Sequence, residues 1–243
     1  MRRRMIALAG VFVLLGWVAP AASAGPRVIL ALGNASFMDA QAIMKATGAE
    51  VTQDPGKVPL QDVAVLVLAN VAFSSLPPPI QNGLADYVNA GGAVLITGGP
   101  QSFGSGGYKT VASIIPFEIR SDNDWRFVGF RSPVPLQPGH PILAGVTFIT
   151  VGALNDMNPR PGALEILQAA GGGGAGPLGI NLGQGRVGGS FPSPLIAELA
   201  VGAGRVIGIA FDLAEFSGMR DLNLFVENTL KYLLASSRMG LGR

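Results

Sequence analysis

The sequence predicts an α/β protein with an open, mostly parallel sheet, helices on both faces, and a C-terminal β-hairpin followed by a helix. Two observations predict this fold. Short, continuous apolar runs recur at 28–32, 63–68 and 93–97, as in strands that are buried on both faces. Segments with apolar residues at helical spacing separate these runs, and such alternation is typical of parallel strands joined by crossover helices.

The first predicted helix lies between the first two of these strands. Its apolar spacing covers 38–47, and Gly48 ends it because glycine readily adopts the left-handed conformation found after helices. A second helix precedes strand 93–97 and opens on the three prolines 77–79. Its expected buried positions are Ile80, Leu84, Tyr87 and Val88.

The second half of the chain contains shorter elements. Strands are expected at 117–120, 148–151 and 164–168, around a proline-punctuated stretch, and the glycine-rich segment 169–193 is expected to be a flexible loop. Order then returns with a hairpin, 195–200 and 205–212. The last helix, 222–234, has one apolar face, formed by Leu222, Phe225, Val226, Thr229, Leu230 and Leu233.

The N-terminus has the features of a secretory signal. Residues 2–4 are arginines, an apolar run follows over 6–18, and the small residues 22–24 form a typical cleavage site. The run is too short for a standard spanning helix, so cleavage is expected, with an uncleaved anchor as the alternative. We therefore expect a signal over 1–24, one α/β domain over 25–243, and a periplasmic or secreted protein without a transmembrane segment after cleavage.

Charge and cysteine content exclude several functions. Three of the 17 lysines and arginines lie in the predicted signal and all 15 acidic residues follow it, so the mature chain has 14 basic and 15 acidic groups. This balance, without clustered basic residues, argues against nucleic-acid binding. The absence of cysteine excludes disulfides, thiolate metal sites and thiol nucleophiles. No cofactor is implied.

Several glycine-led stretches carry a resemblance to a known family. They are 84–104 (LADYVNAGGAVLITGGPQSFG), 106–108 (GGY), 139–142 (GHPI), 202–212 (GAGRVIGIAFD) and 223–228 (NLFVEN). On these the chain resembles the class I glutamine amidotransferase-like superfamily, in its exported, flavodoxin-like branch. The resemblance covers most of the mature chain.

Active members of this superfamily place a cysteine nucleophile at the turn after the strand that corresponds to 93–97. This chain has Gly98, Gly99, Pro100 and Gln101 there, so amidotransferase chemistry through a thiolate is impossible. The resemblance thus implies the fold without the activity. The glycine-rich loop 98–108 follows a central strand at its carboxyl end, where open α/β sheets commonly bind ligands, although it also serves as a tight exit from the strand.

A hydrolase of another mechanism is the alternative. Its weak catalytic candidates are Ser102 as nucleophile, His140 as base, and Asp212, which ends the strand 205–212. His140 is the chain's one histidine, and its turn context between Gly139 and Pro141 favours a structural role.

The carboxylates suggest further chemistry only weakly. Asp122 and Asp124 flank Asn123 at a spacing that could offer oxygen ligands to calcium, but the stretch lacks the rest of an EF-hand, so a solvated turn is expected and no metal site is predicted. A glycosidase-like pair drawn from Asp122, Asp124, Asp156 and Asp212 would need convergence in space.

We therefore expect a non-catalytic, exported binding or assembly domain that acts with another envelope protein or as a homo-oligomer, with a small-ligand sensor as a further alternative. The aromatic group Trp125, Phe127 and Phe130 is expected to pack in the core, although neighbouring arginines also suit an interface. The expected ligand- or partner-binding residues are Gly98, Gly99, Gln101, Ser102, Tyr108, Trp125, Arg126 and Arg131.

Overall fold

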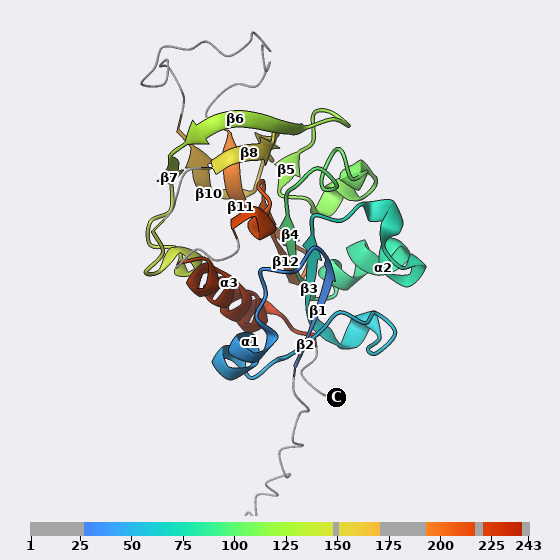
Figure 1. Ribbon diagram of the computed structural model, residues 1–243. Helices are drawn as coiled ribbons and strands as arrows, with labels where there is room; N and C mark the ends of the chain where they lie inside the picture. Colours follow the sequence, from blue (N-terminus) through green and yellow to red (C-terminus); the bar gives the residue numbers. More distant parts are fainter. Residues whose placement is uncertain (1–26, 148–150, 171–192, 217–220, 240–243) are drawn as a thin grey trace, which may run out of the picture.

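The computed structural model describes residues 27–147, 151–170, 193–216 and 221–239 (Figure 1). The predicted signal, 1–24, lies outside the described residues, as does most of the predicted flexible loop 169–193. Within the described ranges, no helix is both long and apolar enough to cross a membrane.

An eight-stranded sheet forms the centre of the protein, in the order β2-β1-β3-β4-β12-β11-β10-β7. The strands from β2 to β12 in this order are parallel, and those from β12 to β7 pair antiparallel. Their bounds are β1 (Val28–Gly33), β2 (Glu50–Thr52), β3 (Val63–Ala69), β4 (Ala93–Thr97), β7 (Pro133–Pro135), β10 (Leu164–Ala169), β11 (Pro194–Val201) and β12 (Gly204–Ile209). The predicted open, mostly parallel α/β sheet is confirmed.

The apolar runs of the sequence form the centre of this sheet. β3 and β4 are buried along their whole length, as expected for strands covered on both faces. The predicted hairpin is β11 and β12, which pair from Ile196↔Ile209 to Val201↔Gly204.

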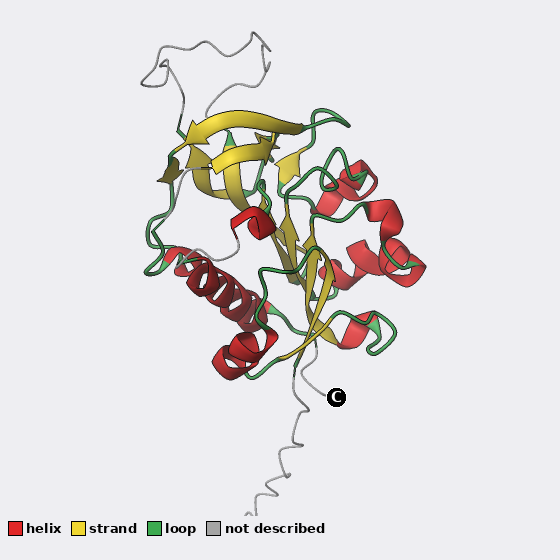
Figure 2. Cartoon of the chain, in the orientation of Figure 1, coloured by secondary structure: helices red, strands yellow, loops and turns green. Residues whose placement is uncertain are grey.

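Helices cover both faces of the sheet (Figures 1 and 2). α1 (Ala40–Thr47) and α3 (Leu222–Ser236) pack on one face, and α2 (Pro78–Asn89) packs on the other together with the 3-10 helix η3 (Tyr108–Ile114). Asp39 caps α1, since its side chain accepts hydrogen bonds from Gln41 N–H and Ala42 N–H. Gly48 ends α1 at φ 72°, as predicted. All the predicted apolar positions of α2 and α3 are buried.

Two short antiparallel pairs lie beside the carboxyl ends of the parallel strands (Figure 1). β5 (Phe117–Glu118) pairs with β9 (Asn158–Pro159), and β6 (Trp125–Arg131) pairs with β8 (Val151–Asn155). β5 is shorter than the predicted strand 117–120. The predicted strand 148–151 falls outside the described residues except for Val151, which begins β8. Four of the strands, β2, β6, β7 and β9, were not predicted from the sequence.

Candidate functional site

The turn after β4 needs glycine at both of its first positions. A Cβ atom on Gly98 would lie 2.5 Å from the carbonyl group of Ala210, and one on Gly99 would lie 2.2 Å from Cγ of Asn70. Gly99 also has φ +137°, a conformation that L side chains rarely adopt. The neighbouring segments therefore approach this turn more closely than any side chain would permit.

The buried amide of Asn155, at the end of β8, binds this turn from the side. Gly99 N–H donates to Asn155 Oδ1 at 2.9 Å, and Asn155 Nδ2 donates to Gly99 O at 3.2 Å. The same Nδ2 group donates to Asp124 Oδ1 at 3.0 Å. Asn155 thus connects the end of β4 to the segment that precedes β6.

Asp124 is 1% exposed and holds the glycine-rich loop. Its Oδ2 accepts from Gly104 N–H at 2.9 Å, and its Oδ1 accepts from Ser105 N–H at 3.1 Å and from the Ser105 hydroxyl at 3.0 Å. The prediction of a solvated turn is correct for Asp122, whose side chain is 85% exposed, and wrong for Asp124. The Asp124 carboxylate is buried because it accepts hydrogen bonds from residues that are distant in the sequence, Gly104, Ser105 and Asn155.

On the other side, Asn70 links the turn to Asp212. Asn70 follows β3 at φ 40°, a strained conformation for a residue other than glycine. Its Nδ2 donates to Asp212 Oδ2 at 2.7 Å, and its Oδ1 accepts from Gln101 N–H at 2.9 Å. We call Asn70, Gly99, Gln101 and Asp212 the carboxyl-edge cluster, because they follow the carboxyl ends of β3, β4 and β12.

Burial raises the pKa of the Asp212 carboxyl above its usual value, although hydrogen bonds from Ala214 N–H and Asn70 Nδ2 act in the opposite direction. Burial also raises the pKa of the nearby Glu215, and the negative charge of Asp212 raises it further. Asp212 in the carboxyl-edge cluster and Glu215 near it thus hold their protons more tightly than usual.

Because its folded-state pKa is raised, Asp212 contributes stability that is fully present below its unfolded value of about 3.8 and is lost as pH rises through the folded value. We expect Asp212→Asn to remove this contribution. As pH rises from 3 to 7, the free energy of unfolding of the wild type should therefore fall relative to that of the variant, as measured by urea unfolding. Asp86→Asn, on the exposed side of α2, is the control. A difference that stays constant with pH would contradict the expectation.

The other residues predicted in the loop, Gln101, Ser102 and Tyr108, differ in how far they are exposed to solvent. Gln101 is exposed, whereas Ser102 is fully buried and its hydroxyl has no hydrogen-bond partner among the described residues. The Tyr108 hydroxyl donates to Val71 O at 3.1 Å, and burial raises its pKa. Ser102 and Tyr108 thus face the protein interior.

His140 lies in a separate buried group on the α3 face. Its Nε2 is 3.2 Å from Glu198 Oε2, its Nδ1 accepts from Ile142 N–H at 3.4 Å, and its ring packs edge-on against Tyr232. Arg205 hydrogen-bonds both Glu198 and the Tyr232 hydroxyl. We call His140, Glu198, Arg205 and Tyr232 the Glu198 cluster. The structure does not join His140 to Ser102.

The Glu198 cluster also changes the titration of its tyrosine. Burial, together with the hydrogen bond and negative charge of Glu198, raises the pKa of Tyr232 to about 12. Glu198 could not be predicted as a site residue, because it lies within the apolar strand β11 with no charged residue beside it in the sequence.

Phe127 and Trp125 in β6 do not both pack in the core. Phe127 is 69% exposed, so the prediction of core packing is wrong for it, and Trp125 is half-buried. Arg126 donates to Asn123 Oδ1 at 3.2 Å. Arg131 ends β6, where its backbone pairs with Val151. Side chains of β6 alternate, so Val128 is buried where Phe127 faces out.

The carboxylates weighed as a glycosidase pair have separate partners. Asp122 pairs with Lys109 at 2.8 Å, Asp156 pairs with Arg120, and Asp212 binds Asn70. Across the described ranges, no three histidine or acidic side chains gather in a way that could hold a metal ion.

The strand order β2-β1-β3-β4-β12 and the turn after β4 define a flavodoxin-like α/β protein. Solved structures with a similar fold support this assignment. A ThuA-like protein from Bacteroides uniformis superposes with a TM-score of 0.53 at 13% identity, covering 92% of this chain and 97% of its own. The chain therefore shares the α/β fold of this ThuA-like protein.

Two cytoplasmic proteins from Salmonella typhimurium are also similar. One superposes with a TM-score of 0.61 at 14% identity, covering 87% of this chain and 99% of its own. The other, from strain LT2, gives 0.57 at 14% identity, with 86% and 98% covered. No family model matches the sequence, and no curated protein matches it. These likenesses establish the fold alone.

Proposed function

We propose that this chain is a non-catalytic binding domain on an amidotransferase-like scaffold, exported to the cell envelope, where it acts with another envelope protein or as a homo-assembly. One observation carries the proposal. The backbone N–H groups in the turn after β4 are occupied by the protein's own side chains: Gly99 by Asn155, Gln101 by Asn70, and Gly104 by Asp124. A hydrolytic turn needs such donors open toward the developing oxyanion.

The reactive groups support the same conclusion. The chain has no cysteine, Ser102 is fully buried, and His140 is bound to Glu198 in the Glu198 cluster. A serine nucleophile needs a base within hydrogen-bond reach. A fold that lacks the nucleophile but is otherwise retained fits a protein that functions by binding a partner.

The surface around β6 supplies the contact. Phe127 is the most exposed large hydrophobic residue described, and the half-buried Trp125 and Arg126 precede it. Aromatic residues and arginine are enriched where protein interfaces hold most of their binding energy. We propose Phe127 as the centre of the partner surface.

The test starts with residues 25–243 used to capture partners from native envelope, followed by identification and purification of the captured protein. We expect Phe127→Ser to weaken binding of the purified partner, or of a second copy of this chain, at least about tenfold, as loss of an aromatic anchor does. Met44→Ser is the matched control, since Met44 is 52% exposed on α1. Equal binding by both variants would remove β6 from the proposal, and a monomer that binds no purified partner would reject it.

A second candidate rests on the raised pKa values of Asp212 and Glu215. A raised carboxyl pKa favours the protonated form that a general acid needs. Turnover of a substrate that Asp212→Asn abolishes, with the fold intact, would replace the binding function by acid-assisted hydrolysis at the carboxyl-edge cluster.

A further inference from the structure

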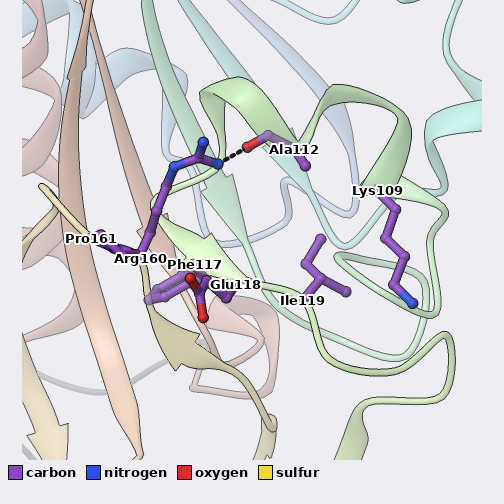
Figure 3. A pocket seen from close by; sticks show the side chains of 7 residues that line it. All are labelled: Lys109, Ala112, Phe117, Glu118, Ile119, Arg160 and Pro161. Atoms are coloured by element: carbon purple, nitrogen blue, oxygen red, sulfur yellow. Dashed lines mark hydrogen bonds between the residues drawn. The ribbon is translucent and has the colours of Figure 1, made fainter.

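A pocket of about 420 Å³ lies between η3, β5 and the end of β9 (Figure 3). Its apolar lining comes from Phe117, Ile119 and Pro161. Its charged lining comes from Lys109, Glu118 and Arg160. It shares no residue with the carboxyl-edge cluster or with the surface around Phe127.

The apolar part of the pocket is rigid. Phe117 is 1% exposed and packs edge-on against Phe103, with ring centroids 5.4 Å apart. A Cβ atom on Gly208 would lie 2.6 Å from the Phe117 ring, so this ring sits directly on the sheet. Ile119 lies beside it in the pocket lining (Figure 3). Phe117 thus supports the pocket from below, and the apolar surface open to a ligand comes from Ile119 and Pro161.

Arg160 supplies an oriented positive charge. Its guanidinium donates to the carbonyl of Ala112 in η3, which holds the side chain against η3 at one end of the pocket (Figure 3). Its backbone N–H donates to Pro116 O at 3.2 Å. Within the described part of the chain, no carboxylate forms an ion pair with Arg160, so most of its N–H donors remain for a ligand.

Lys109 lines the opposite side (Figure 3). It pairs with Asp122 at 2.8 Å, but the side chains are 43% and 85% exposed, and such surface pairs contribute little. A ligand anion can therefore compete for Lys109. Glu118, also in the lining, would repel a second negative charge.

We propose that this pocket binds a small monocarboxylate with an apolar body. The carboxylate binds the Arg160 guanidinium, and Lys109 adds positive charge from the opposite side of the pocket (Figure 3). The apolar body packs on Ile119 and Pro161. The guanidinium fork matches a carboxylate in geometry, and Glu118 disfavours dianions. The site is independent of the proposed partner surface.

The test uses residues 25–243 and phenylacetate as the probe, with binding followed by calorimetry and by amide chemical shifts. We expect saturable binding in the millimolar range, with shifts at Phe117 and Ile119. Phenylacetamide, which has the same shape without the charge, should bind at least about tenfold more weakly, the loss typical of a charge-assisted hydrogen bond. Phenylmalonate, a dianion, should also bind more weakly.

Substitutions of Arg160 and Lys109 test whether phenylacetate binds in this pocket. Arg160→Gln should weaken phenylacetate binding about tenfold and Lys109→Gln severalfold. Lys231→Gln, a basic residue on α3 over the opposite face of the sheet, should leave binding unchanged, and so should Phe127→Ser. If Arg160→Gln fails to fold, Lys109→Gln decides, since its only described ion pair is exposed. No saturation by the wild type, equal binding of phenylacetamide, or unchanged binding by Lys109→Gln would overturn the proposal.

Discussion

Replacing Asp124 by alanine is expected to lower the free energy of unfolding by about 4 kcal/mol. The substitution leaves Gly104 N–H and one Asn155 Nδ2 hydrogen buried with no acceptor, and it also removes both hydrogen bonds from Ser105. Each buried donor left unpaired costs about 1–3 kcal/mol, and the donors here lose a charged acceptor. Urea unfolding of residues 25–243, followed by circular dichroism, measures the loss.

Asp122→Ala is the matched control, because it removes the same side chain two residues earlier. Asp122 is 85% exposed and its ion pair with Lys109 is at the surface, so the change should stay within about 0.5 kcal/mol. A small loss in both variants would show that water or a shifted loop replaces the Asp124 carboxylate. The inference that the turn after β4 is rigid, on which the proposed function depends, would then be wrong.

The contrast between Asp122 and Asp124 shows where sequence reasoning stops. The two aspartates have similar local sequence, and both suit a polar turn. The donors that bury Asp124 come from Gly104, 20 residues earlier, and from Asn155, 31 residues later. Only the tertiary arrangement distinguishes the two carboxylates, so the sequence alone could not.

The central strands β3 and β4 could be predicted because their local composition is apolar throughout. Strands covered on both faces are continuous apolar runs, and β3 and β4 consist of such runs. Helix α3 was equally predictable, since its apolar positions recur at helical spacing and all are buried.

Elements that depend on distant pairing were harder to predict. β2 has three residues and is held by its register with β1, Val28↔Glu50 to Leu30↔Thr52. β7 is an edge strand that contains two prolines, which normally argue against a strand. Phe127 was expected in the core because aromatic residues usually are buried, but the pairing of β6 with β8 turns it outward.

Part of the carboxyl-edge cluster could be predicted from strand order. The sequence indicates Gly99 and Asp212 because Gly99 follows one predicted strand and Asp212 ends another, and ligands of open α/β sheets bind at the carboxyl ends of strands. Asn70 follows strand 63–69 in the same way, so the same argument would have found it. Asn155 carried no such signal, since β8 belongs to a separate pair of strands.

The second large effect is expected in the Glu198 cluster, which ties β11, β12 and α3 to the segment before the 3-10 helix η4 (Pro141–Leu143). Glu198 is 7% exposed and pairs with both Arg205 and His140. Glu198→Ala removes the acid and leaves the cation of Arg205 without its carboxylate. Breaking a buried pair in this way typically costs 3–5 kcal/mol. We expect about 3 kcal/mol, because Arg205 keeps contact with water and with the Tyr232 ring at 5.0 Å.

A double-mutant cycle separates the pair from the loss of packing. Arg205→Ala should cost less in the Glu198→Ala background than in the wild type, because in that background it removes a cation that has already lost its partner. Four urea unfolding curves at pH 7 give the coupling energy, expected to be at least about 1 kcal/mol. Glu227→Ala, which removes an exposed pair with Lys231 on α3, should change stability by less than about 0.5 kcal/mol. Additive losses would mean that Glu198 stabilises the protein through packing and not through Arg205.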